Sequence, residues 1–549
     1  MEKLKTLDEF KSWAKENGFI YPSSEIYGGF AAVYDYGHYG ILLKNNIQRA
    51  WEKSMVQERN DILMLDSGIF MHPKTWVASG HVGGFDDVLV EDKKTHTRYR
   101  ADHLVEEACE KIEFDTLVKH LIEYVNQEEY KVLDNRWVSH NGPNGSEPIF
   151  LIRKGQGGEL TIEDFKAETK DLDALEYVLP VMVARIYNQV SNNKLVDLDK
   201  ASAKELEQVI KILHIKSPQG NDLTEPRAFN LLVKSNMGTT DSSFSEENVT
   251  YLRGETCQGI YLEYKNYRDT LRPKLPFGIA QVGKAFRNEI IARQFVFRTR
   301  EFEQMEMQYF HKPADKQNLF EMWKETRMKW HVEELGINPD KLRFKKHEKL
   351  VFYASQAFDI EYNYETLGGF KELEGLHDRG DYDLTQHSKF SGEKLDYFDQ
   401  ETGERLVPHI METSVGLNRI LMMVLEDAYT KEELTNSKGE KDSRVVLKLK
   451  KSLAPIKVAI LPLSKKPELQ QKALEVQDMI KSQYMTQYDE TASIGKRYRR
   501  QDEVGTPYCV TIDFETLNDQ AVTIRDRDTM QQDRIKISDL VEYLNKSFK

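Results

Sequence analysis

The segment 286–310, FRNEIIARQFVFRTREFEQMEMQYF, brings arginines and glutamates together in one short stretch. Alternate residues of a β-strand share a face, so Arg298 and Arg300 are expected to point the same way. A turn near 291–294 would bring Arg287 towards them. Guanidinium groups bind phosphate bidentately, so this hairpin would suit a polyphosphate. The pattern alone is equally typical of the charged face of an exposed hairpin.

The same alternation separates the residues that follow into two sets. Carboxylates on the strand are suited to an amine or a metal ion. One face is predicted to carry Phe302, Gln304 and Glu306, and the opposite face Glu301, Glu303, Met305 and Met307.

The sequence lacks the motifs of several other catalytic chemistries. Residues 278–285, GIAQVGKA, approach the phosphate-binding pattern G-x-x-x-x-G-K-[ST], but Ala285 stands where a hydroxyl must meet Mg²⁺. No H-E-x-x-H, G-x-S-x-G or paired C-x-x-C occurs, which excludes zinc peptidases, serine hydrolases and zinc ribbons.

The composition indicates an acidic protein of three or four domains. The 549 residues include 77 Lys+Arg and 90 Asp+Glu, and the net charge of −13 argues against non-specific coating of nucleic acid. The three cysteines are widely spaced, so neither a disulfide framework nor a zinc site is expected. No apolar run could span a membrane, and residues 1–18 lack the apolar stretch of a secretory signal. We therefore expect a cytoplasmic protein with no membrane or DNA partner.

The distribution of apolar, charged and turn-forming residues along the chain predicts its domains and main elements. Residues 7–17 and 41–56 are expected to be helices, and 259–267, GIYLEYKNY, a strand. The second helix places Leu43, Ile47, Trp51 and Met55 on one face. The predicted division is a catalytic domain at 1–110 and 226–443, an insertion at 111–225, a polar linker at 434–443 and an α/β domain at 455–549.

Taken together, these segments are similar to those of a known protein family. Segment 286–310 resembles motif 2 of class II aminoacyl-tRNA synthetases, and most closely that of homodimeric glycyl-tRNA synthetases. The matches cover most of the chain except roughly 111–225. Four further regions support the resemblance: motif 3 at 416–429, motif 1 at 34–51, the segment that closes over the amino acid at 71–87 with 98–104, and the anticodon-binding domain at 495–514.

The resemblance implies an α+β fold and an assembly. The expected fold is the class II antiparallel sheet of six or seven strands with helices, followed by a mixed α/β anticodon-binding domain. The family forms homodimers through the motif 1 region, so the apolar face of helix 41–56 is expected at the subunit interface. The insertion 111–225 is a candidate contact for the tRNA acceptor end.

The resemblance also implies adenylation, in which the amino-acid carboxylate attacks the α-phosphate of ATP. Positioning and charge neutralisation are sufficient for this step. Arg287 and Arg419 are the implied catalytic residues, Phe302 is expected to stack on adenine, and Glu372 and Glu412 are expected to hold Mg²⁺, with no zinc. The implied ATP site comprises Arg287, Asn288, Glu289, Phe297, Arg298, Thr299, Arg300, Glu301, Phe302, Glu372, Leu373, Gly416, Leu417, Asn418 and Arg419.

Glycine presents only an ammonium and a carboxylate, so a selective site needs several carboxylates and no side-chain cavity. The sequences RGET (253–256) and ETS (412–414) lose the prolines of the family but keep their glutamates. Either Glu303 or Glu306 is expected to contact the ammonium. The implied glycine site comprises Arg100, Glu255, Phe302, Glu303, Gln304, Met305, Glu306, Glu412, Thr413, Ser414, Val415 and Gly416.

The densest basic cluster, Lys496, Arg497, Arg499 and Arg500, is a candidate tRNA contact in the C-terminal domain. The leading function is ATP-dependent attachment of glycine to tRNA(Gly) through glycyl-adenylate. One alternative is another class II synthetase, which the small anionic site disfavours. The other is a non-catalytic tRNA-binding paralogue, which would be expected to lose the phosphate-binding arginines.

Overall fold

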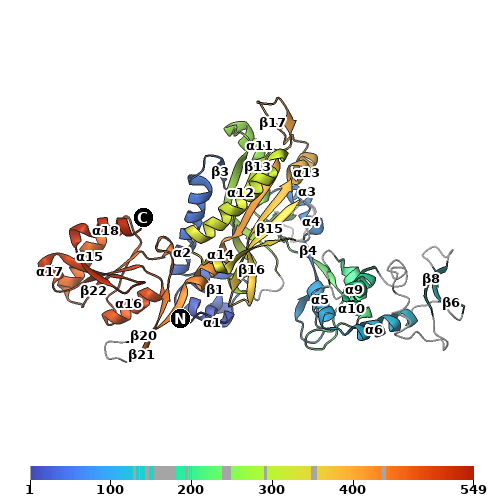
Figure 1. Ribbon diagram of the computed structural model, residues 1–549, viewed down its shortest axis with the longest axis horizontal. Coiled ribbons are helices and arrows are strands. Elements are labelled where there is room, and N and C mark those ends of the chain that lie inside the picture. Colours follow the sequence, from blue (N-terminus) through green and yellow to red (C-terminus); the bar gives the residue numbers. More distant parts are fainter. Residues whose placement is uncertain are drawn as a thin grey trace. The chain divides into compact units, whose positions relative to one another are not determined.

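The computed structural model describes residues 2–127, 131–134, 137–141, 148–153, 181–191, 196, 198, 201–237, 249–289, 294–347, 355–435 and 441–548 (Figure 1). The chain forms two compact units. The first comprises Met1–His81 with Leu232–Lys549, and the second comprises Val82–Leu231.

A seven-stranded sheet is the centre of the first unit, as predicted. All of its neighbouring strands are antiparallel except β3 and β12, which are parallel. The strand order is β14 (Leu342–Lys346), β15 (Gln356–Tyr364), β16 (Gly369–Gly380), β19 (His409–Gly416), β13 (Glu301–His311), β12 (Phe277–Phe286) and β3 (Ile62–Leu65).

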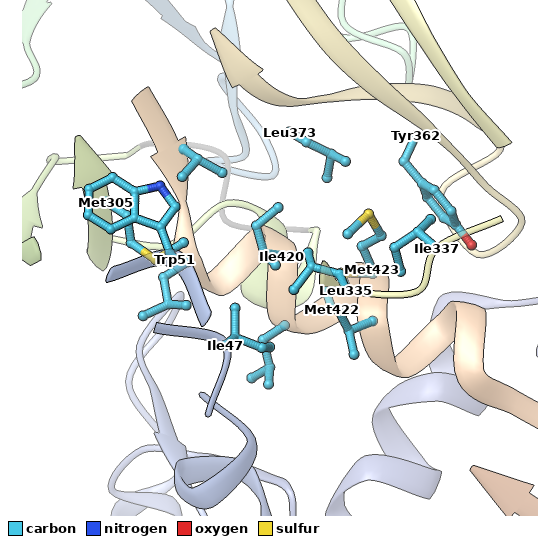
Figure 2. Close-up of a cluster of buried hydrophobic side chains, with 14 of the residues drawn as sticks. Ile47, Trp51, Met305, Leu335, Ile337, Tyr362, Leu373, Ile420, Met422 and Met423 are labelled. Carbon is cyan, nitrogen blue, oxygen red and sulfur yellow. The ribbon is translucent and has the colours of Figure 1, made fainter. Parts of the chain in front are cut away.

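One face of this sheet is covered by α14 (Leu417–Ala428), α2 (His38–Glu52) and α12 (Lys316–Lys329), which bury a large hydrophobic core (Figure 2). Every apolar residue predicted on one face of the helix 41–56, Leu43, Ile47, Trp51 and Met55, is buried within this core. The interpretation of this face as a subunit interface was therefore wrong. Trp51 and Ile47 pack in the same cluster as Ile420 and Met422 of α14, so their apolar surface is buried within one subunit.

The other face of the sheet is covered by α11 (Cys257–Leu271) and α13 (Tyr382–Ser391). The segment 259–267 lies within α11, so its prediction as a strand was wrong. Its aromatic and β-branched residues favour a strand locally, but Ile260, Tyr261 and Tyr264 meet the sheet from one side of a helix. Residues 278–285 lie in β12 and form no phosphate-binding loop.

The C-terminal domain is a mixed α/β domain, as predicted. Its five-stranded sheet has the order β23 (Thr486–Tyr488), β22 (Val458–Pro462), β24 (Tyr508–Ile512), β25 (Ala521–Asp526) and β26 (Gln532–Lys536). Strand β22 is parallel to both of its neighbours, and the remaining pairs are antiparallel. The helices α15 (Pro467–Ile480) and α18 (Leu540–Ser547) share its hydrophobic core.

The described parts of the predicted linker 434–443, residues 434–435 and 441–443, lie in the two strands of a hairpin. Strand β20 (Tyr429–Thr435) pairs with β21 (Lys441–Leu447), and 436–440 lie outside the described residues. The polar composition of this segment predicted a linker. Instead, Arg444 of β21 joins the hairpin to the C-terminal domain, because it donates hydrogen bonds to Asp502 at 3.0 Å and to Glu432 of β20 at 2.8 Å. Asp502 also accepts two hydrogen bonds from Arg525. Buried ion pairs centred on Asp502 therefore link the C-terminal domain to the hairpin.

The second unit has its own core. Strand β4 (Asp86–Glu91) pairs with β5 (Arg98–Arg100) and β9 (Arg227–Asn230), which precede and follow the predicted insertion 111–225. Its other elements are α5 (Ala101–Lys111), α6 (Phe114–Gln127), α9 (Val181–Ser191), α10 (Ala203–Ile212) and a small sheet of β6 (Lys131–Asp134), β7 (Trp137–Asn141) and β8 (Pro148–Arg153). Across both units, none of the helices in the described ranges has the length and apolar character needed to cross a membrane.

Replacing Arg444 with Ala should destabilise the attachment of the C-terminal domain. The side chains of Arg444 and Asp502 are 1% and 0% exposed, and removing one partner of a buried ion pair typically costs about 3–5 kcal/mol. Urea unfolding followed by circular dichroism measures this effect. Arg534→Ala is the control, because its pairs with Asp513 and Asp519 are partly exposed and should contribute less than about 1 kcal/mol. Equal losses of unfolding free energy in the two variants would contradict a stabilising role of the buried Arg444–Asp502 ion pair.

Candidate active site

A cavity of about 210 Å³ lies on the α11 face of the seven-stranded sheet, over β13, β16 and β19. The sheet register explains which residues meet there, because Glu306 pairs with Ser414 and Gln304 with Gly416. Of the predicted residues, the cavity is lined by Glu255, Arg287, Glu289, Phe297, Arg298, Thr299, Phe302, Gln304, Glu306, Glu372, Leu373, Glu412, Ser414, Gly416, Asn418 and Arg419.

The predicted alternation along β13 places its two sets of side chains correctly. Phe302, Gln304 and Glu306 line the cavity, whereas Met305 and Met307 enter the core on the other face. Some other predicted residues also face away from the cavity. Val415 and Leu417 belong to the core, Thr413 is buried, Glu303 pairs with Lys44, and Glu301 pairs with Lys284.

The pairing of Arg298 with Arg300 on one face was wrong, because residues 295–297 form a 3₁₀ turn and β13 begins only at Glu301. Arg298 lines the cavity and donates from Nε to Glu289 at 2.9 Å. Arg300 instead donates to the backbone carbonyl oxygens of Glu289 and Ala31 at 3.1 and 3.3 Å. Neither Arg300 nor the predicted Asn288 lines the cavity.

Two further arginines face the same space as Arg298. Arg287 donates from Nε to the carbonyl oxygen of Gly254 at 3.1 Å, and its guanidinium carbon lies 5.4 Å from the centroid of the Phe302 ring. Arg419 lies 4.5 Å from the centroid of the Phe297 ring and 3.2 Å from the Glu372 carboxylate. The charge of Arg419 lowers the pKa of Glu372. These arginines can therefore bind anions next to an aromatic ring.

Three carboxylates line the same cavity: Glu306 and Glu412 are buried, and Glu255 is partly buried. Glu255 lies 3.2 Å from Nε2 of His81 and accepts a hydrogen bond from Gln258 at 3.0 Å. Burial disfavours its charge, but His81 and Arg379 hold its pKa well below the ordinary value.

Glu306 and Glu412 differ in the charges that they meet. Burial together with the charges of Glu412 and Glu255 raises the pKa of Glu306 to about 8. Burial also opposes the charge of Glu412, but Arg379 and His377 outweigh it and lower the pKa of that carboxyl. The cavity therefore holds one carboxyl that is mostly protonated at neutral pH beside two that are ionised.

Sequence reasoning missed the residues that organise these carboxylates. Arg379 donates to Glu412 at 2.9 Å and makes two hydrogen bonds to Asp383. His377 Nδ1 lies 2.8 Å from the Glu412 carboxylate, and this bond raises the histidine pKa although burial opposes it. Both come from HDRGD at 377–381, whose charges within a strand were the available signal. His81 carried no signal, because its partner Glu255 is far away in the sequence.

Two of the predicted site groups are not among the residues that line the cavity. Arg100 belongs to the second unit, where it pairs with Asp87 at 3.1 Å and with Asp102 at 2.5 Å. In the basic cluster, which lies on α16 (Ile494–Glu503), Arg497 is buried and donates to the carbonyl oxygens of Pro462 and Leu463. The prediction that Arg497 contacts tRNA was therefore wrong for the side chain as it stands.

The remaining members of the basic cluster are more accessible. Lys496 and Arg500 are exposed, and Arg499 is partly exposed. Arg499 pairs with Asp442 at 2.6 Å, and Arg500 pairs with Asp489 at 2.5 Å.

Comparisons with known proteins agree with this geometry. Residues 241–428 match the family described as "tRNA synthetase class II core domain (G, H, P, S and T)", and residues 457–547 match "Anticodon binding domain". A curated glycine--tRNA ligase of Chlorobaculum tepidum is 40% identical over 98% of this chain and 99% of its own length. The glycine--tRNA ligase of Clostridium acetobutylicum is 41% identical over 100% of both chains.

A solved structure shares the fold. The prolyl-tRNA synthetase of Cryptosporidium parvum, complexed with L-proline and AMP, matches with a TM-score of 0.53 and 13% identity. The match covers 98% of this chain and 74% of that chain. At this identity the likeness concerns the fold alone.

Proposed function

The chain belongs to the class II glycyl-tRNA synthetases, and from this we propose that its cavity joins glycine to ATP as glycyl-adenylate and then transfers glycine to tRNA(Gly). The observation that carries the proposal is that Arg287, Arg298 and Arg419 line one cavity together with the carboxylates of Glu255, Glu306 and Glu412. These two sets of groups are complementary to a triphosphate and to an ammonium group.

Adenylation needs anionic groups brought together rather than a general base. The glycine carboxylate is already a nucleophile, and its attack on the α-phosphate expels pyrophosphate. Arg287, beside Phe302, is suited to hold the carboxylate and the α-phosphate, because its planar guanidinium binds both bidentately. Arg298 and Arg419 are suited to the outer phosphates. Phe302 and Arg419 line the same cavity, which supports stacking of adenine between them.

Mg²⁺ prefers oxygen ligands, and Glu372 and Glu412 both present carboxylates to the cavity. When bound, Mg²⁺ would neutralise charge on the phosphates. The carboxylate of Glu412 already accepts from Gln308, Arg379 and His377, so Glu372 is the better candidate of the two.

The ammonium of glycine has three N–H donors, which Glu255, Glu306 and Glu412 can accept. The walls beside them are polar, because Gln304 donates to Ser414 at 3.3 Å and accepts from the Thr256 backbone at 3.2 Å. A methyl group at the α-carbon would meet these polar atoms without an apolar subsite. Glu306 is favoured over Glu303 as the third carboxylate, because Glu303 is paired with Lys44 outside the cavity.

We assign the remaining partners by domain. The anticodon-binding match at 457–547 and the accessible Lys496, Arg499 and Arg500 support a tRNA contact there. The insertion is proposed to contact the acceptor end of the tRNA. A homodimer is supported by Ile26, Tyr27 and Phe30, whose side chains are 88%, 87% and 60% exposed, rather than by the α2 face.

Glycine should be the one amino acid that drives rapid ATP–pyrophosphate exchange, with alanine poor. Arg287→Ala should lower exchange by at least about 100-fold, because a preorganised cation is lost, and Arg287→Lys should not restore it. Arg300→Lys is the control, since Arg300 does not line the cavity. Comparable exchange with alanine, or near-normal exchange in Arg287→Ala, would refute the assignment.

Binding of glycine near pH 7 should release a proton from Glu306. The pKa of its carboxyl lies at about 8, and an ammonium beside it would favour the ionised form. Apparent affinity should therefore rise with pH up to about 8, by at most about tenfold per pH unit.

Calorimetry in buffers of different ionisation enthalpy counts the released protons. Glu306→Gln should abolish the release, and Glu303→Gln on the same strand should preserve it. A wild-type protein that releases no proton, or a release that Glu306→Gln leaves unchanged, would contradict this account of the carboxylates.

A further inference from the structure

Three side chains beside the cavity lie close enough to share one metal ion. They are His347, which directly follows β14, Asp359 of β15 and His377 of β16. One ligand atom from each lies within 4.8 Å of the other two. The sheet brings them together, because the His347 backbone donates to Ala357 at 3.0 Å and Ala357 pairs with His377 in the strand register.

We propose that these residues form a binding site for a borderline divalent transition-metal ion, and for Zn²⁺ in particular. Imidazole nitrogen and carboxylate oxygen are common zinc ligands, and three protein ligands leave a further coordination position. Two imidazoles disfavour Mg²⁺, which prefers oxygen. The site is therefore chemically distinct from the carboxylates proposed for Mg²⁺, and it departs from the expectation that the chain has no zinc.

The orientation of His377 supports this site. Its Nδ1 lies 2.8 Å from the carboxylate of Glu412, which leaves Nε2 as the ring nitrogen for an ion. Histidines that bind metals almost always donate their other ring N–H to a carboxylate, a carbonyl or a water. The Glu412 carboxylate itself accepts a hydrogen bond from Arg379 at 2.9 Å, which fixes the outer partner of the proposed ligand at a second point.

His347 and Asp359 are the other two ligands of the proposed site. Nε2 of His347 lies 2.8 Å from Oδ2 of Asp359, so the two groups are close enough to bind one ion together. Imidazole nitrogen and carboxylate oxygen are both zinc ligands.

A bound ion would also act on the proposed glycine site, and this consequence rests on the proposed function. It would keep the proton of His377 on Nδ1, facing Glu412, and so hold that carboxylate in place. The ion is thereby assigned a positioning role rather than a role in bond making or breaking.

Metal uptake by the full chain tests the site. The protein is stripped with a chelator, loaded with Zn²⁺ alone, dialysed and analysed for bound zinc, and its affinity is measured by competition with a chromophoric chelator. We expect one ion per chain. His377→Ala, His347→Ala and Asp359→Asn should each weaken binding by more than about 100-fold, beyond the effect of changing an outer partner.

His409→Ala is the matched control. His409 lies in the same sheet with its ring 6.0 Å from that of His311, much as the rings of His347 and His377 are 5.9 Å apart, but it is not part of the cluster. His377→Ala leaves His347 and Asp359 in place, so it separates a metal site from a simple ion pair. Co²⁺ should give visible ligand-field bands in the wild type that are absent in His377→Ala, and thermal melts establish that each variant is folded.

A wild-type chain that retains no zinc, or His377→Ala binding zinc as tightly as the wild type, would overturn the proposal. The measurement uses no ATP, glycine or tRNA. Its failure is therefore distinguishable from failure of the proposed function.

Discussion

Three carboxylates share one buried space, and much of the architecture around the cavity serves to keep them there. Buried carboxylates repel one another, and desolvation disfavours their charge. Arg379 offsets this cost at Glu412 and is itself held by two hydrogen bonds to Asp383 of α13. Gln258 of α11 donates to Glu255 and contacts His387 of α13. The two helices on this face are therefore joined to the sheet through the polar network that shapes the cavity.

The opposite face of the sheet has a different role. Met305 and Val415 enter the large core while their neighbours Glu306 and Ser414 face the cavity. Alternation along a strand thus ties the position of each polar group to an apolar residue packed behind it. A shift of register by one residue would bury carboxylates in the core, so packing against α2 and α14 keeps the site in register.

Local patterns predicted the parts of the site that lie on regular elements. The β13 alternation placed Phe302, Gln304 and Glu306 correctly, and the β/α alternation after residue 455 predicted the C-terminal domain. The predictions failed where tertiary contacts decide. Arg300 precedes the strand rather than lying in it, and the segment 259–267 is helical. Arg497 donates hydrogen bonds to backbone carbonyl oxygens of its own domain.

Two of the groups that sequence reasoning missed, His81 and His347, share one property. His81 reaches Glu255 and His347 reaches Asp359 only after the chain has folded, and no residue spacing within one segment announces either contact. The apolar face of α2 shows the same limit in reverse, because its period predicts a buried face without specifying what covers it.

The central claim is that Glu255, Glu306 and Glu412 bind the ammonium of glycine while Arg287 binds the phosphoryl group. A crystal structure of the chain with a non-hydrolysable glycyl-adenylate analogue tests it most directly. The account predicts the ammonium nitrogen about 3 Å from oxygens of these three carboxylates, with the Arg287 guanidinium on the phosphoryl mimic. An analogue bound with its ammonium against Glu303, or outside this cavity, would contradict it.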